Sequence, residues 1–273
     1  MHLTSKPYPL KSIFSFVLTL SFFCTLPQIV TAQEGQEFYQ LKVYHLKDSD
    51  QKKRLEHYLE HAYLPALHRA GINMVGVFYP SSSGEETENG NNDSLLYVLI
   101  PFSSLNQFVA IDDLILKDSE YKETAKNYLE AAFDKPPYAR YESILMEAFS
   151  GMPTLQAPNL MGKKSGRIFE LRSYEAATEM LHLNKVKMFN DGEIEIFKRL
   201  GFNAIFYARV LAGSKLPNLM YMTSFENMDS REAHWKAFGE DPGWVNLSAD
   251  PQYENNFLKA DIYLLHSTTY SDI

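Results

Sequence analysis

Two strand-like segments, "IFELRSYE" (168–175) and "FYQLKVYH" (38–45), each carry a row of polar side chains that alternates with apolar ones. Alternate residues of a strand share one face, so each row forms one polar surface. A guanidinium such as Arg172 or an ammonium such as Lys42 can hold an anionic group, while tyrosines can stack on a ring or donate hydrogen bonds. The next strand-like segment places three more polar residues on one face. The ligand-binding candidates are therefore Lys42, Tyr44, Glu170, Arg172, Tyr174, Asn203, Tyr207 and Arg209.

The orientation of these rows decides what they can do. We expect the alternating apolar residues, Leu41 and Leu171 among them, to face the helices, which leaves the polar rows facing the space between two sheets. Because buried polar groups must be paired, two hypotheses follow. Either the rows line a pocket for a small organic or lipid-like ligand between the sheets, or Glu170 and Arg172 satisfy each other and hold two half-barrels together.

A second motif, "HYLEH" (57–61), fits the H-x-x-E-H pattern, in which two histidines one turn apart bind zinc and glutamate acts as a base. The apolar stripe of Leu55 and Leu59 predicts that His57 and His61 lie on the opposite face of the helix, toward solvent. No third ligand is evident from the sequence. We therefore predict no metal site. The alternative is a metal site formed by His57 and His61.

Several other features are expected to be structural. Trp235 and Trp244 are predicted to pack onto a sheet rather than to surround a ligand. Asn190 and Glu193 fall on a buried helix stripe, where either a kink with caps near Gly192 or a buried polar spot would explain them. Haem would usually need an inward-facing histidine, and the pattern forces none inward, so no cofactor is predicted.

The elements that position these residues occur twice in the chain. "RAGIN" (69–73) is echoed 130 positions later by "RLGFN" (199–203), and the flanking segments correspond in constant order with small shifts at loops. Each unit predicts strand, helix, strand, strand, helix, strand, and Gly71 or Gly201 ends the first helix in the left-handed conformation. Four strands with two helices on one face form a ferredoxin-like unit. The sequence thus predicts an α+β fold of two tandem ferredoxin-like βαββαβ repeats that form a pseudo-dimeric α/β barrel.

The domain boundaries follow from this repetition. They are a signal peptide (1–32), a first ferredoxin-like repeat (33–149), a linker rich in Gly, Pro and Lys (150–166) and a second ferredoxin-like repeat (167–273).

The first residues have the layout of a secretory signal. Lys6 and Lys11 precede an apolar run that is short for a membrane span, and Val30 and Ala32 have the spacing that signal peptidase favours. We expect a secreted or periplasmic protein after cleavage near Ala32, without a stable membrane anchor. Cys24, the single cysteine, would leave with the signal, which excludes disulfides and thiolate chemistry.

The composition limits the partners. Hydrophobic residues make up 45% of the 273 residues and aromatic residues 14%, which suffices for a buried core. The net charge of −8 argues against nucleic acid as a partner. A small-molecule ligand fits the pattern. A homo-oligomer is compatible with the sequence but not required, because the duplication already supplies two half-barrels.

The second repeat resembles the NIPSNAP family. The resemblance rests on "FELRSY" (169–174), "KRLGF" (198–202) and "REAHWKAFGEDPGW" (231–244), the last of which is similar to the family's Arg…Ala…Asp-Pro-x-Trp stretch. The first repeat matches more loosely, with "YQLKVY" and "DSEY" in the corresponding places. The resemblance implies the dimeric α/β-barrel fold shared with antibiotic-synthesis monooxygenases and with haem-degrading or haem-binding relatives. It implies no reaction, because the family has no agreed catalytic residues.

Three functions from different classes stay open, and with them whether the protein is an enzyme. The first is an exported protein that binds a small organic or lipid-like ligand between its sheets. The second is a cofactor-free monooxygenase or isomerase that uses Tyr174, Arg172 and Asn203 to polarise a carbonyl or enolate. The third is a non-catalytic interaction protein whose barrel is filled by its own side chains.

Overall fold

The computed structural model describes residues 2, 35–81 and 95–273 of the chain. The predicted signal peptide with its cleavage site near Ala32, Cys24, and nearly all of the loop 81–93 lie outside the described residues. All the described helices and strands belong to one structural unit, Gly35–Ile273. No helix among the described residues is long and apolar enough to cross a membrane.

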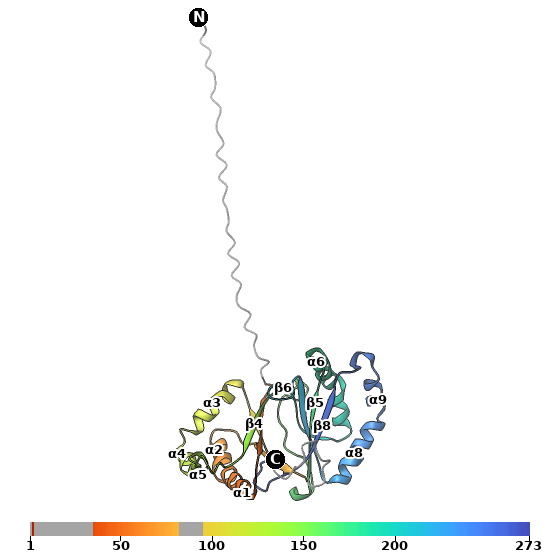
Figure 1. Ribbon diagram of the computed structural model, residues 1–273. Coiled ribbons are helices and arrows are strands. Elements are labelled where there is room, and N and C mark those ends of the chain that lie inside the picture. Colours follow the sequence, from red (N-terminus) through yellow and green to blue (C-terminus); the bar gives the residue numbers. More distant parts are fainter. Residues whose placement is uncertain (1, 3–34, 82–94) are drawn as a thin grey trace. The chain divides into compact units, whose positions relative to one another are not determined.

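Eight antiparallel strands form a closed barrel in the order β1-β3-β2-β8-β5-β7-β6-β4. Figure 1 shows β4, β5, β6 and β8 in the middle of the molecule, with helices on either side. The strands are β1 (Phe38–His45), β2 (Gly76–Pro80), β3 (Leu95–Phe102), β4 (Arg140–Ala148), β5 (Ile168–Glu175), β6 (Asn203–Ala212), β7 (Asn218–Phe225) and β8 (Lys259–Ser267). We call β1–β4 with their helices the first half of the molecule and β5–β8 with theirs the second half. Within the barrel the halves read β4-β1-β3-β2 and β8-β5-β7-β6, and the β2–β8 and β4–β6 pairs join them. Closure pairs the strands at both seams, so these strands leave no open sheet edge.

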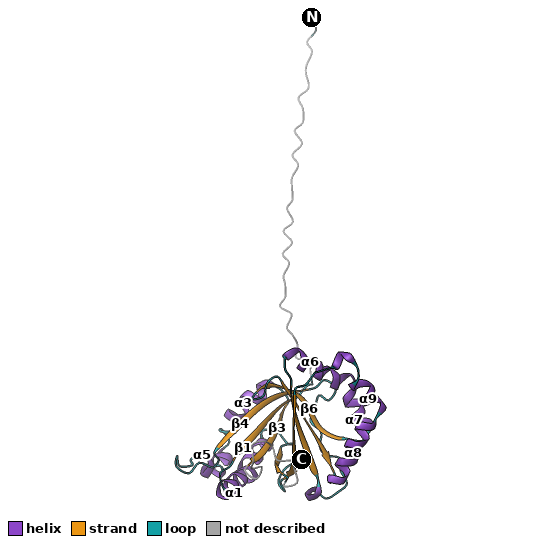
Figure 2. Ribbon diagram, turned by 45° about the vertical axis from the view of Figure 1, so that its right-hand side comes forward, coloured by secondary structure: helices purple, strands orange, loops and turns teal. Residues whose placement is uncertain are grey.

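The helices lie outside the barrel, those of the first half on one side and those of the second half on the other (Figure 2). The first half carries α1 (Ser49–Tyr58), the π-helical turn η1 (Leu59–Tyr63), α2 (Leu64–Arg69), α3 (Leu105–Ile115), α4 (Ser119–Thr124) and α5 (Lys126–Leu129). The second half carries α6 (Glu179–Met188), the π-helical turn η4 (Phe189–Glu193), α7 (Ile194–Arg199), α8 (Met228–Glu240) and α9 (Pro242–Ser248). Short 3₁₀ turns are η3 (Lys164–Gly166), at the end of the predicted linker, and η5 (Pro251–Tyr253).

Each half has a π-helical turn at the same place in its first helical segment. The widened turns, Leu59–Tyr63 and Phe189–Glu193, start 130 residues apart. Near Gly192 the helix widens into this π-helical turn without a side-chain cap, and the Asn190 side chain donates to the Val186 carbonyl at 2.9 Å. Such turns shift the side chains that follow and often occur at functional sites. Both helical segments then end as predicted, at Gly71 and Gly201 with φ of 85° and 78°.

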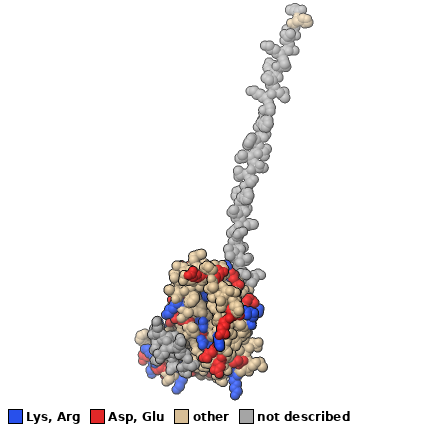
Figure 3. All heavy atoms as spheres, turned by 90° about the vertical axis from the view of Figure 1, so that its right-hand side faces the viewer, with Lys and Arg blue, Asp and Glu red and all other residues tan. Residues whose placement is uncertain are grey.

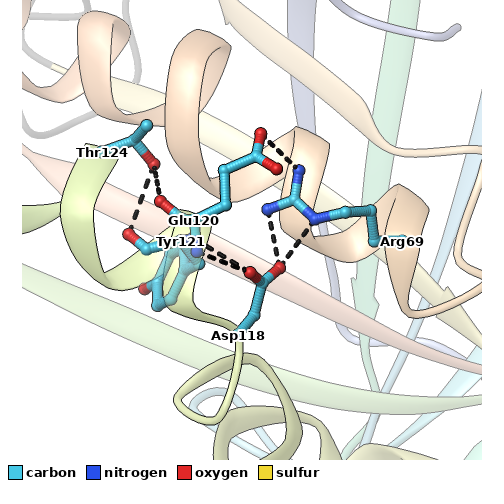
Figure 4. A network of polar contacts seen from close by, with 5 residues as sticks. All are labelled: Arg69, Asp118, Glu120, Tyr121 and Thr124. Atoms are coloured by element: carbon cyan, nitrogen blue, oxygen red, sulfur yellow. Dashed lines mark hydrogen bonds and ion pairs between the residues drawn. The ribbon is translucent and has the colours of Figure 1, made fainter.

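The arginines of "RAGIN" and "RLGFN" make the same kind of contact in each half, an ion pair with an aspartate that caps a later helix. Arg69 pairs with Asp118, the residue that caps α4, and also with Glu120 (Figure 4). Arg199 makes two hydrogen bonds of 2.8 Å to Asp241, which caps α9. These bonds lower the pKa of both aspartates, that of Asp241 to about 2. The pair thus ties the end of one helical segment to the start of another.

The barrel interior is apolar. One cluster of buried side chains contains residues from all eight strands, and only the space enclosed by the barrel can bring these residues together. Leu41, Leu171 and Met222 belong to this cluster and are each 0% exposed. Two other clusters lie between the strands and the helices, one in each half.

The predicted orientation of the strand faces is therefore wrong. Leu41 and Leu171 face the barrel interior, while Tyr44 and Tyr174 pack under the helices. The physical reason is that apolar side chains fill the barrel interior, whereas the helices outside supply hydroxyl, indole and guanidinium groups.

Candidate functional site

The polar rows of β1 and β5 form two separate clusters, each between the strands and the helices of its own half. The Lys42 cluster in the first half comprises Lys42, Tyr44, Tyr58, Tyr63, Tyr121, Tyr128 and Tyr141. The Glu170 cluster in the second half comprises Glu170, Arg172, Tyr174, Tyr221, Arg231 and Trp235. The prediction that both rows face one common space between two sheets is therefore wrong.

Lys42 is buried without a carboxylate partner. It lies in the middle of β1 with 8% of its surface exposed, and its Nζ donates to the Tyr63 hydroxyl at 2.8 Å. The same Nζ lies 4.8 Å from the centre of the Tyr63 ring and 5.7 Å from that of Tyr141. No carboxylate oxygen of the described residues lies within 4.0 Å of it. The π-helical turn η1 ends at Tyr63 and places its hydroxyl over the strand.

Tyrosines form the wall of this cluster. The hydroxyls of Tyr58 and Tyr121 lie 2.9 Å apart, and the Tyr58 ring stacks on Tyr128 with 3.6 Å between centres. Burial raises the pKa of Tyr44 to about 12 and that of Tyr63 still further. These phenols are therefore neutral at physiological pH and can donate hydrogen bonds.

Glu170 in the second half is fully buried and fully paired. Its Oε1 accepts from Arg172 Nε at 2.5 Å, and its Oε2 accepts from Arg231 Nε at 2.5 Å and from Trp235 Nε1 at 2.8 Å. The Arg172 guanidinium stacks 3.6 Å from the centre of the Trp235 ring and donates to the Tyr174 hydroxyl at 3.0 Å. The hypothesis that Glu170 and Arg172 satisfy each other is confirmed. They connect β5 with α8, however, and do not hold the two half-barrels together.

A second buried ion pair lies next to this cluster. Lys185 Nζ of α6 is 2.8 Å from Glu193 Oε2, and their side chains are only 4% and 3% exposed. The ammonium lies 4.9 Å from the centre of the Phe189 ring and 5.6 Å from that of Trp244. Burial raises the pKa of Glu193, against the opposing effect of Lys185. Of the two alternatives for Glu193, the buried polar spot is confirmed.

Sequence reasoning missed several members of these clusters. Arg231 and Trp235 stand in the "REAHWKAFGEDPGW" stretch, so the motif marked them without revealing their contact with Glu170. Lys185 and Glu193 are eight residues apart, and the π-helical turn between them brings them together. A regular helical repeat gives no sign of that turn.

The three candidates on β6 separate from one another. Tyr207 lies under the helices, 5.6 Å from the ring of Tyr221, as the shared polar face requires. Arg209 pairs with Glu147 of the neighbouring strand β4 at 2.5 Å. Asn203 does not join them, which corrects the prediction, because a bulge between Ala204 and Phe206 breaks the alternation. Its amide oxygen instead accepts from Ser224 at 2.9 Å and from the backbone of the linker.

The "HYLEH" histidines lie at the surface. The rings of His57 and His61 are 4.6 Å apart, and His61 is 55% exposed beside Glu60. Their predicted solvent-facing orientation is confirmed. Over the described part of the chain, no group of three or more potential metal-ligating side chains converges.

The two clusters differ in one decisive position. Glu170 precedes Arg172 by two residues and neutralises it, whereas Gln40 precedes Lys42 by two residues and donates to Ser143 at 2.7 Å. An amide cannot balance an ammonium charge. The arrangement in the first half can therefore accept an anion from outside, while the Glu170 cluster already contains its own.

His182 of α6 gives the second half a pH-dependent stability. It is 7% exposed, its Nδ1 has no hydrogen-bond partner among the described residues, and burial together with Arg209 lowers its pKa. A histidine with a lowered folded-state pKa is protonated first in the unfolded chain, so stability is lost as the pH falls below about 6.5. We expect His182→Gln to reduce the loss of stability between pH 7 and pH 5, measured by urea unfolding. An unchanged pH profile in this variant would contradict the assignment.

Comparison with known proteins gives a family match for the second half. Residues 169–272 match the NIPSNAP family. A search of the curated proteins finds no match.

Among solved structures, a "putative monooxygenase" from Lactobacillus acidophilus NCFM is 8% identical with a TM-score of 0.54, covering 85% of this chain and 94% of that chain. An anthrone oxidase-like protein is 10% identical with a TM-score of 0.51, covering 86% and 92%. A NIPSNAP family protein from Agrobacterium tumefaciens str. C58 is 20% identical with a TM-score of 0.36, covering 42% and 98%. At such identities the first two likenesses show the α/β-barrel fold alone.

Proposed function

We propose that this protein binds a small organic anion at the Lys42 cluster, between β1 and the helices of the first half. The observation that carries the proposal is the buried ammonium of Lys42, which has a tyrosine hydroxyl and aromatic rings around it but no carboxylate of the described residues within 4.0 Å. A buried charge without a counter-ion is costly, and an anionic ligand would remove that cost. This location replaces the space between the sheets, which apolar side chains fill.

The surroundings define the class of ligand. Neutral tyrosine hydroxyls can donate to a carboxylate or a phenolate, and tyrosine rings offer faces for an aromatic or otherwise flat body. Tyr141 is 45% exposed and is thus the part of the cluster that faces solvent. A small carboxylic acid with an apolar body fits this combination.

Thermal unfolding with benzoate tests the proposal, with benzamide as the neutral ligand of the same shape. A ligand at 100 times its Kd stabilises the folded state by about 2.7 kcal/mol. For a chain of this size we therefore expect benzoate to raise the unfolding midpoint by roughly 5–10 °C and benzamide to leave it unchanged. Equal shifts with both compounds, or none with benzoate, would remove the support for an anion site.

The hypothesis of a cofactor-free monooxygenase or isomerase has weaker support. Arg172 is already held by Glu170, Tyr174 and the Trp235 ring, and Asn203 lies apart from them. The solved structures described as a monooxygenase and an oxidase share the fold at 8% and 10% identity. Oxygen uptake with a quinol-type substrate, above a control without protein, would restore this hypothesis.

The proposal also covers the internal duplication of the chain and its export. The matching strand orders, π-helical turns and arginine–aspartate pairs support two tandem ferredoxin-like repeats that arose by duplication. The first 32 residues support export, with cleavage near Ala32. N-terminal sequencing of the protein recovered outside the cytoplasm tests the cleavage site.

A further inference from the structure

Several basic side chains line a surface groove in the first half. It has a volume of about 550 Å³ and lies between α1 and the segment that runs from α5 toward β4. Its lining includes Lys53, Arg54, His57, Lys126, Tyr128 and Lys135. Pockets of 300–1,000 Å³ commonly hold small molecules.

The cations of this groove lack acidic partners among the described residues. None of Lys53, Arg54, Lys126 and Lys135 forms an ion pair with an acidic side chain of the described residues, and the one acidic side chain in the lining is Glu130. Arg54 Nη1 donates to the Lys135 carbonyl at 2.9 Å, which holds the two walls together. Four cations gathered from two walls raise the local concentration of anions, although the chain as a whole carries −8.

The corresponding region of the second half is arranged differently. There Lys187 is paired with Asp191, and Asn184 donates to the Gln252 carbonyl at 2.5 Å. On the face of the molecule in Figure 3, which is the right-hand side of Figure 1, acidic and basic side chains are interspersed. The gathering of cations without acidic partners in the first-half groove is therefore not repeated in the corresponding region of the second half.

The groove also has a fixed apolar wall. Tyr128 is half-buried and stacks on Tyr58 with ring planes 3° apart, which fixes the orientation of its ring, and the buried Pro137 also lines the groove. An organic body can lie on this wall while its charged groups reach the lysines and the arginine.

We propose that this groove binds a small organic polyanion, one that carries a phosphate group or several carboxylates. The groove shares Tyr128 with the Lys42 cluster but does not include Lys42 itself, and it takes a different class of ligand. Several lysines suit a ligand with several charges, because each is an independent point charge, and Arg54 can add a bidentate contact.

Calorimetric titration at low salt tests this site, with inorganic pyrophosphate and citrate as probes. We expect wild-type protein to bind at least one of them and Lys53→Gln/Lys126→Gln to bind it at least tenfold more weakly. Stronger binding of pyrophosphate would assign a phosphate ligand, whereas equal or stronger binding of citrate would assign a polycarboxylate. Added salt should weaken the interaction, because the cations are exposed to solvent.

The controls separate this site from other effects. Lys187→Gln removes a paired lysine of the second half and should leave the affinity unchanged. Lys42→Met should also leave it unchanged, which distinguishes the groove from the proposed function. The inference is overturned if wild-type protein binds neither probe, or if the Lys53→Gln/Lys126→Gln variant binds as tightly as the wild type.

Discussion

Replacement of Glu170 by glutamine is expected to lower the free energy of unfolding by about 3–5 kcal/mol. The Glu170 side chain is 0% exposed and receives hydrogen bonds from Arg172, Arg231 and Trp235. An amide of the same shape would leave two guanidinium groups, 14% and 19% exposed, without a counter-ion between them. Urea unfolding of the wild type and the variant at pH 7 measures the difference.

The matched variant in the first half is Lys42→Met. It removes a buried charge that has no carboxylate partner, and it deprives only the Tyr63 hydroxyl of a donor. We expect its stability to stay within about 1 kcal/mol of the wild type. A loss as large as that of Glu170→Gln would mean that Lys42 has a structural role, and a small loss in Glu170→Gln would mean that its cluster is not an ion-paired core.

The second large effect concerns the Lys185–Glu193 pair. Glu193→Leu alone leaves a buried ammonium among aromatic rings and is expected to cost about 3–5 kcal/mol. The double variant Lys185→Met/Glu193→Leu removes both charges together, and we expect it to recover most of that loss. The four proteins of this double-mutant cycle give the coupling energy directly. Additive effects would show that the two side chains do not act as a pair.

Much of the fold could be predicted from the sequence because it depends on local chemistry. The strands follow from alternation, and Gly71 and Gly201 mark helix ends because glycine adopts a positive φ freely. The echo of "RAGIN" and "RLGFN" located corresponding elements, whose arginines pair with Asp118 and Asp241.

The orientation of the strands could not be predicted in the same way. Alternation shows that Leu171 and Arg172 face opposite sides, but which side is the barrel interior depends on how eight strands close. The partners on α8 that make Glu170 suitable for the helix side, Arg231 and Trp235, lie 61 and 65 residues away in sequence. Tertiary contacts therefore determine which face of each strand points toward the helices.

The site was predicted only in part for the same reason. Lys42, Tyr44, Glu170, Arg172, Tyr174 and Tyr207 all belong to the polar layer under the helices. Asn203 left the predicted face through a bulge, and Glu193 reached Lys185 through a π-helical turn. Both irregularities change the residue count of an element by one, which a regular period cannot indicate.

Titration calorimetry with benzoate shows whether the unpaired ammonium of Lys42 makes the first half an anion receptor. Lys42→Met removes the charge, whereas Gln40→Glu supplies an internal carboxylate at the position that Glu170 occupies in the second half. We expect wild-type protein to bind benzoate and both folded variants to bind it at least tenfold more weakly. Benzoate binding of equal affinity in all three proteins, or no binding to the wild type, would contradict this proposal.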